Sequence, residues 1–149
     1  MSKLEVINSI VINANTAEVW DWLVNPEKTK QYMFGCEAVS DWKIGSSLEW
    51  KMIHEGAELI PVKGFVKEFI LNSKLVYTVI DPFAKYADIP ENYLNVIYTL
   101  NETIEGVQLT VTQNGFEAAQ DGIKRYQEVY NEGEGWNPVL LKIKELIEG

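Results

Sequence analysis

The chain has 149 residues, of which 46% are hydrophobic, and it carries a net charge of −9. This length and apolar content suffice for a real core, so we expect a single domain over residues 1–149 and no extensive disorder. A negative field repels phosphate backbones and anionic lipid, and no basic stretch exceeds Lys-Thr-Lys at 28–30. We therefore expect no nucleic-acid partner.

No apolar run approaches the length of a membrane-spanning helix, and the N-terminus lacks the basic start and continuous apolar stretch of a signal peptide. We therefore expect a cytoplasmic protein without membrane insertion. The single cysteine, Cys36, cannot form an internal disulfide, and the single histidine, His54, is its only companion for zinc. The sequence predicts no metal and no cofactor.

Two short helices are expected after an opening strand. Residues 4–12 alternate like a strand, and Asn15 with Glu18 three residues later forms a capping-box-like helix start. The apolar stripe of the first helix is Val19, Trp20, Leu23 and Val24. Trp22 points roughly 200 degrees away from Trp20, so only one indole can face the interior. Pro26 then begins a second helical turn, over 26–33.

From residue 36 to 116 the apolar residues recur with period two, which is typical of half-buried strands. The expected strands cover residues 47–54, 61–70, 73–81, 95–101 and 107–116. Short turns at 71–73 and 105–106 predict an antiparallel meander, and the link over 81–92 predicts a longer loop at one rim.

The period becomes helical again after Phe116, first over 118–130 and then over 136–149. The last segment has the spacing of an amphipathic helix, with Trp136, Val139, Leu140, Ile143, Leu146 and Ile147 on one stripe. Leaving six such side chains in water would forfeit about 10 kcal/mol as an upper estimate, so this helix must lie on the sheet. The order predicts an α+β architecture with a strongly curved antiparallel sheet.

Several segments in this order resemble the START-like helix-grip (SRPBCC) superfamily. They are TAEVWDWLVNPEKTKQYM after the first strand, GFVKEF followed by KLVYTV, LTVTQNGF, and GW before LLKIKELIE. The narrower resemblance is to proteins homologous to the activator of the heat-shock chaperone ATPase, and it covers roughly residues 5–148. It implies a helix-grip fold, in which a sheet of about six to seven strands wraps around the long C-terminal helix and two short helices follow strand one.

The resemblance also implies a cavity between sheet and helix, because members of the superfamily mostly bind lipids or other apolar small molecules there. The apolar candidates for its wall are Trp20, Trp50, Met52, Val66, Tyr77, Tyr98, Trp136, Leu140 and Ile143. The same residues would equally make a plain core, since even a cavity wall is mostly apolar.

Polar residues on the inward parity of the strands are the more informative signal. His54, Glu68 and Gln113 share this parity, and a buried polar group needs a partner or water. They either lie at strand ends, where water reaches them, or converge on the polar end of a ligand. On the second interpretation we expect His54 and Gln113 to be polar ligand contacts.

A catalytic site finds little support. His54 is the candidate general base, but no spacing places Glu68 or Asp81 within its hydrogen-bond reach. The serines lack a nucleophile elbow, and the glycines form no phosphate-binding loop. We therefore predict no catalytic residues, and enzymatic activity stays open as the less favoured alternative.

Three functions stay open at this point. We favour the binding of a small hydrophobic or amphipathic ligand. The second is a co-chaperone-like protein interaction, although the chaperone-stimulating relative has an additional N-terminal domain for which we expect no room here. The third is a small cyclase-type or hydrolase-type enzyme that uses His54 and water. Phe65 and Phe69, expected on the outer sheet face, suggest a homodimer surface unless Lys63 and Lys67 shield them.

Overall fold

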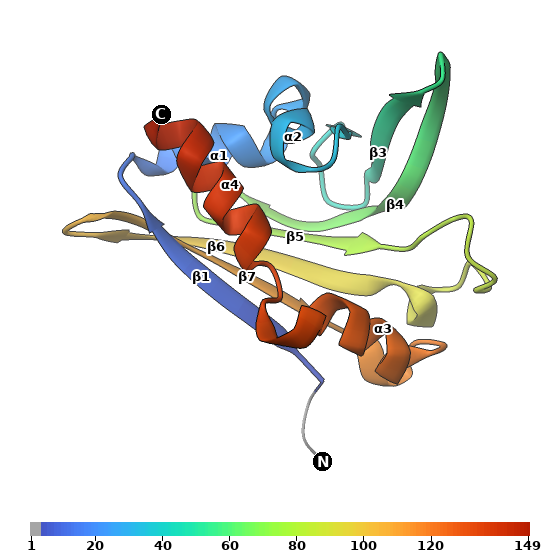
Figure 1. The fold of residues 1–149 in the computed structure, drawn as a ribbon. Coiled ribbons are helices and arrows are strands. Elements are labelled where there is room, and N and C mark those ends of the chain that lie inside the picture. The colour runs from blue at the N-terminus through green and yellow to red at the C-terminus, as the bar shows by residue number, and fades with distance from the viewer. Residues whose placement is uncertain (1–3) are drawn as a thin grey trace.

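The computed structural model describes residues 4–149, in which seven strands form one antiparallel sheet in the order β1-β7-β6-β5-β4-β3-β2. The strands are β1 (Val6–Ile12), β2 (Glu37–Ser40), β3 (Ser47–His54), β4 (Ala57–Ile70), β5 (Lys74–Val79), β6 (Leu94–Thr103) and β7 (Gly106–Asn114). Sequential neighbours from β2 to β7 form a meander, and β1 pairs with β7. The sheet curves strongly, and the β3–β4 hairpin projects from it at the upper right of Figure 1.

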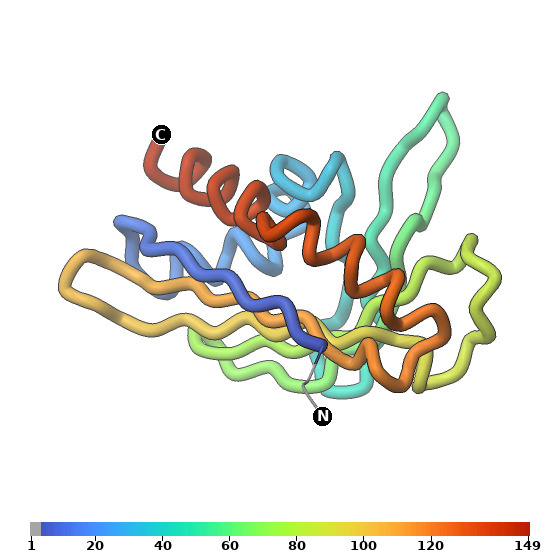
Figure 2. The backbone as a smooth tube through the Cα atoms, turned by 60° about the horizontal axis from the view of Figure 1, so that its bottom comes forward, coloured from blue at the N-terminus to red at the C-terminus, as the bar shows by residue number. Residues whose placement is uncertain are grey.

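The helices cover the concave side of this sheet. They are α1 (Thr16–Val24), α2 (Pro26–Tyr32), α3 (Gly122–Tyr130) and α4 (Asn137–Glu148), with single turns η1 (Pro90–Asn92), η2 (Phe116–Ala118) and η3 (Asn131–Gly133). Figures 1 and 2 show α4 lying across the sheet, with α1 and α2 on the same side. The predicted α+β helix-grip architecture is confirmed. None of the helices described within residues 4–149 is long and apolar enough to cross a membrane.

Asparagine caps explain where the two short helices begin. Asn15 Oδ1 accepts a hydrogen bond from the Glu18 backbone N–H at 2.8 Å, and Asn25 Oδ1 accepts one from the Glu27 N–H at 3.0 Å. Trp20 is buried and meets Phe69 edge-on, with ring centroids 5.2 Å apart. Trp22 is half-buried beneath the Lys28 ammonium, which lies 5.1 Å from its ring centroid. As expected, only Trp20 joins the core.

A β-bulge overturns part of the predicted strand parity. The register of β4 against β5 shifts between Val66 and Glu68, so one extra residue moves the following side chains to the opposite faces. Phe69 therefore points inward, and Glu68 pairs with Lys74 at 3.3 Å outside the core. The expectations of an inward Glu68 and an outward Phe69 are wrong, and of the two phenylalanines only Phe65 lies on the outer face.

Gly64 allows β4 to approach β5 closely. A Cβ atom at this position would lie only 1.6 Å from the Thr78 carbonyl oxygen, so any other residue would push the strands apart. The neighbouring Phe65 N–H donates to Thr78 Oγ1 at 3.0 Å. A second register shift follows in β3–β4 between Trp50 and Met52, at the level of Pro61. These irregularities bend β4 along its length.

The main core lies between α4, α1 and the sheet end that joins β6 to β7. Its fully buried aliphatic side chains come from both layers: Ile12, Leu23, Leu75, Leu109, Leu140 and Ile143. Polar contacts fix α4 beside β1, where Lys144 Nζ donates to the Val11 carbonyl oxygen at 2.7 Å and Glu148 Oε2 accepts from the Asn13 N–H at 2.9 Å. This end of the molecule is referred to below as the closed end.

Candidate functional site

A cavity of about 380 Å³ lies at the other end of the sheet, beneath the β3–β4 hairpin and beside the start of α4. Five of the predicted site residues are on its wall: Trp50, Met52, Tyr77, Gln113 and Trp136. Further wall residues come from the turn after α2 and from β4, β5 and β6. We call this region the open end.

The strand register determines which residues lie side by side on the floor of the cavity. Val66 faces Tyr77, Tyr77 faces Val96, and Val96 faces Gln113 across four neighbouring strands. Directly opposed residues on one face have close Cβ atoms, so this row forms a continuous strip. Tyr77, Val96 and Gln113 line the cavity, whereas Val66 is buried beside it.

Aromatic rings continue from one wall of the cavity to the other. The ring centroids of Trp50 and Tyr77 are 5.9 Å apart, those of Tyr77 and Tyr98 are 5.9 Å apart, and Tyr98 meets Trp136 edge-on at 6.1 Å. The Tyr77 and Tyr98 hydroxyls are hydrogen-bonded at 3.3 Å. Such offset and edge contacts stabilise the wall beyond what the burial of apolar area provides.

Trp136 is held in place by the first strand. Its backbone N–H donates to Asn8 Oδ1 at 2.9 Å, and its indole Nε1–H donates to Gln113 Oε1 at 3.0 Å. Gly135 has a φ of 53°, and a Cβ atom there would lie 2.3 Å from Asn8 Oδ1. The Gly-Trp pair that precedes α4 therefore lets the chain touch β1 and directs the indole at the cavity.

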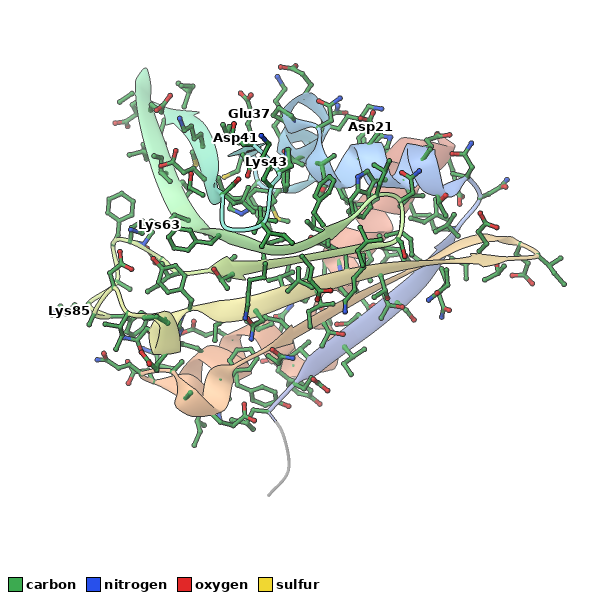
Figure 3. The ribbon with its side chains drawn as sticks, turned by 180° about the vertical axis from the view of Figure 1, so that it is seen from behind. Asp21, Glu37, Asp41, Lys43, Lys63 and Lys85 are labelled. Atoms are coloured by element: carbon green, nitrogen blue, oxygen red, sulfur yellow. The ribbon has the colours of Figure 1, made fainter. Side chains whose placement is uncertain are left out.

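The cavity wall carries no formal charge. Of the described residues that line it, none is Asp, Glu, Lys, Arg or His. Burial raises the pKa of the Cys36 thiol and raises the pKa of the Tyr77 hydroxyl well above its ordinary value, so both are neutral at pH 7. Figure 3 shows charged residues at the outside, with Lys63 and Lys85 near the 81–92 loop and Asp21 on α1.

The other predicted site residues lie elsewhere. Trp20, Val66, Tyr98, Leu140 and Ile143 are buried in the core and do not line the cavity. Tyr98 still supports it from behind, through its contacts with two wall residues.

His54 is exposed near the tip of the β3–β4 hairpin, opposite Ala57. Of the two alternatives for this residue, the strand end reached by water is therefore the one observed, and the inward position is wrong, because the tip of the hairpin lies in solvent.

The turn after α2 is the part of the wall that sequence reasoning missed. Met33, Phe34 and Cys36 line the cavity, and Phe34 is 82% exposed with a φ of 54°. An unbranched sulfur-bearing side chain such as Met33 adapts to varied shapes. The available signal was an aromatic residue next to Gly35 directly after a helix, where no periodicity governs which way a side chain points.

The residues give no indication of a metal centre. Within the described part of the chain, no group of three His, Cys, Asp or Glu side chains could hold a metal ion. The geometry of the open end instead suits an apolar molecule that approaches one buried amide, that of Gln113.

The family model for "Activator of Hsp90 ATPase homolog 1-like protein" matches residues 13–148. The chain belongs to this family. Its match covers every element from α1 to α4. No curated protein matches the sequence.

Solved structures share this fold. The solution structure of ChR145 from Cytophaga hutchinsonii is 36% identical, with a TM-score of 0.76 over 99% of this chain and 97% of that one. A crystal structure from Nitrosomonas europaea is 18% identical, with a TM-score of 0.73 over 99% and 96%. The Aha1 dimer from Colwellia psychrerythraea is 15% identical, with a TM-score of 0.68 over 97% and 96%. Family and fold support a ligand-binding or Aha1-like domain in general terms.

Proposed function

We propose that this protein binds a small hydrophobic or amphipathic molecule in the open-end cavity. The observation that carries the proposal is a hollow of about 380 Å³ whose wall is apolar and aromatic except for one buried amide. Binding sites for small molecules typically have volumes of roughly 300–1,000 Å³ and combine apolar walls with a few placed polar groups.

The position of the cavity supports the same proposal. The cavity lies where α4 begins. The later residues of α4 fill the closed end, and the start of the helix leaves room at the open end. Met33 and Met52 on its wall are flexible and can adjust to a guest. Apolar surface that a ligand buries there contributes roughly 25 cal/mol per Å² to binding before the costs of association.

Titration with N-phenyl-1-naphthylamine, an uncharged dye that brightens in apolar surroundings, tests the function. We expect saturable brightening with one dye per chain. In the Val62→Phe variant a ring enters the cavity, and we expect the dye to bind at least tenfold more weakly. Val39→Phe is the matched control, because Val39 is on β2 outside this cavity and is partly exposed.

Two outcomes would contradict the proposal. One is a linear, unsaturable rise of dye fluorescence with the unmodified protein. The other is equal affinity in the Val62→Phe and Val39→Phe variants, which would place the dye elsewhere. Native mass spectrometry of the purified protein adds an independent measurement, since a retained molecule appears as additional mass.

A second function, stimulation of a heat-shock chaperone ATPase, is favoured by one specific observation, the family match over residues 13–148. Titrating an Hsp90-type ATPase with this protein tests it. Unchanged ATP turnover at saturating protein would exclude this role and leave ligand binding untouched.

A further inference from the structure

The orientation of the Gln113 amide follows from its partner. An indole N–H can only donate, so the Gln113 atom that lies 3.0 Å from Trp136 Nε1 must be the acceptor oxygen Oε1. The amide nitrogen Nε2 then carries two hydrogens on the other side of the group. Among the described residues, Nε2 donates to no acceptor, although the Gln113 side chain lies on the cavity wall and is only 6% exposed.

This amide is also held rigidly. Gln113 lies on β7 between Val6 of β1 and Val96 of β6, so strand pairing on both sides fixes its backbone. Rotating the amide would break its bond with Trp136, whose own backbone is tied to Asn8. The cavity wall therefore presents a preorganised hydrogen-bond donor.

The rest of the wall disfavours charge. A carboxylate or ammonium group inside this cavity would lose its hydration without meeting an opposite charge, because no described wall residue is ionised at pH 7. The Tyr77 hydroxyl is already bonded to Tyr98, which leaves Gln113 as the principal polar contact. The planar rings of Trp50, Tyr77 and Trp136 suit a flat apolar body.

We infer that Gln113 selects uncharged ligands in which a flat apolar body carries a carbonyl or ether oxygen, and that this oxygen accepts a hydrogen bond from Gln113 Nε2. The inference rests on the ligand-binding function proposed above and adds the chemical class of the ligand. It makes Gln113 a specificity-determining residue.

Two isosteric probes test this class. 2-Acetylnaphthalene and 2-isopropenylnaphthalene have the same shape and differ in having a carbonyl oxygen or a methylene group. Their dissociation constants are measured by ligand-observed NMR with the unmodified protein and with Gln113→Met. Each probe leaves water at the same cost whichever protein it binds. A change in the ratio of the hydrocarbon's dissociation constant to that of the ketone, between the unmodified protein and Gln113→Met, therefore reports on the hydrogen bond alone. We expect this ratio to fall about three- to tenfold in Gln113→Met.

Gln108→Met is the matched control, since Gln108 is on the same strand with the opposite parity and does not line the cavity. It should leave the ratio unchanged. The charged probes 2-naphthoate and 2-naphthylmethylammonium should bind the unmodified protein at least tenfold more weakly than the ketone. If Gln113→Met fails to fold, the side-chain amide resonances of Gln113 in the unmodified protein provide the measurement, and they should shift with the ketone far more than with the hydrocarbon.

The outcomes separate the two proposals. Equal ratios in the unmodified protein and Gln113→Met, with amide resonances that respond alike to both probes, would overturn the inference while cavity binding stands. Tighter binding of either charged probe than of the ketone would also overturn it. If neither these probes nor N-phenyl-1-naphthylamine binds at all, the proposed function fails and the inference fails with it.

Discussion

The two ends of the layer between α4 and the sheet are built differently. At the closed end, Leu140 and Ile143 of α4 are fully buried against aliphatic side chains of the sheet. At the open end, the same helix begins with Trp136, and aromatic and sulfur-bearing side chains surround a cavity. The side chains of the closed end fill its interior, whereas those of the open end leave a cavity between them. One end therefore stabilises the fold, and the other leaves the cavity in which we propose that a ligand binds.

The shape of β4 explains how one sheet can have two such different ends. After Gly64 this strand runs along β5 toward the closed end, and before Gly64 it bends so that the β3–β4 hairpin rises on the side of the sheet that carries α1, α2 and α4 (Figure 1). Residues on the two sides of the bend therefore meet different surroundings. Val66 is buried next to Tyr77, while Val62 is half-buried on the cavity wall.

The largest expected effect comes from charging the closed end. Leu140→Asp places an unpaired carboxylate in a fully buried position, and we expect it to lower the free energy of unfolding by about 5 kcal/mol or more, comparable to the whole stability of a small domain. Urea unfolding followed by circular dichroism measures this change. The control Leu141→Asp affects the next residue, which is 53% exposed, and should stay within about 0.5 kcal/mol.

Equal stability of these two variants would mean that α4 does not dock as described. The closed end would then not differ from the open end in how tightly its side chains are packed.

A second effect concerns the buried tyrosines at the boundary between the ends. Burial, partly offset by the hydrogen bond with Tyr77, raises the pKa of Tyr98 to about 12, and burial raises the pKa of Tyr32 and Tyr77 well above the ordinary value. Below the unfolded-state pKa of about 10 all are protonated in both states. Above it the unfolded chain loses protons that the native protein keeps, so the free energy of unfolding falls as pH rises.

For Tyr98 the loss amounts to roughly 3 kcal/mol between pH 10 and 12, at about 1.4 kcal/mol per pH unit. Tyr98→Phe should reduce the slope of unfolding free energy against pH by about 1.4 kcal/mol per pH unit relative to the unmodified protein. Urea unfolding of both proteins between pH 9.5 and 11.5 measures the two slopes. Identical slopes would show that Tyr98 ionises freely in the native protein.

The smallest effect compares the two valines of β4 directly. Val66→Phe overfills a packed position and should lower the free energy of unfolding by about 1–3 kcal/mol. Val62→Phe adds the same ring beside empty space and should cost less than about 1 kcal/mol. Urea denaturation of both variants measures the difference. A greater loss for Val62→Phe would indicate that the open end is as tightly packed as the closed one.

Most of the fold could be predicted because its elements have regular periods. The period-two pattern located five strands, and the amphipathic stripe of the last segment located α4. The short strand β2 was missed, since four residues are too few for a pattern. The predicted helix over 118–130 begins later, at Gly122, because residues 116–118 form a separate single turn.

The candidate site was less predictable, and the reasons are local. One extra residue in β4 exchanged the faces of Glu68 and Phe69, and a bulge leaves no mark in composition or spacing. Parity identified Gln113 correctly as inward but failed for His54, because alternation does not show where a hairpin leaves the sheet. Leu140 and Trp136 share a helical stripe, yet only Trp136 reaches the cavity.

The tether between Asn8 and Trp136 joins residues 128 positions apart. During synthesis β1 leaves the ribosome long before Trp136, so the indole wall and the orientation of Gln113 can form only after residue 136 has been made. A chain that stops before Trp136 therefore lacks the indole wall and leaves Gln113 without its partner.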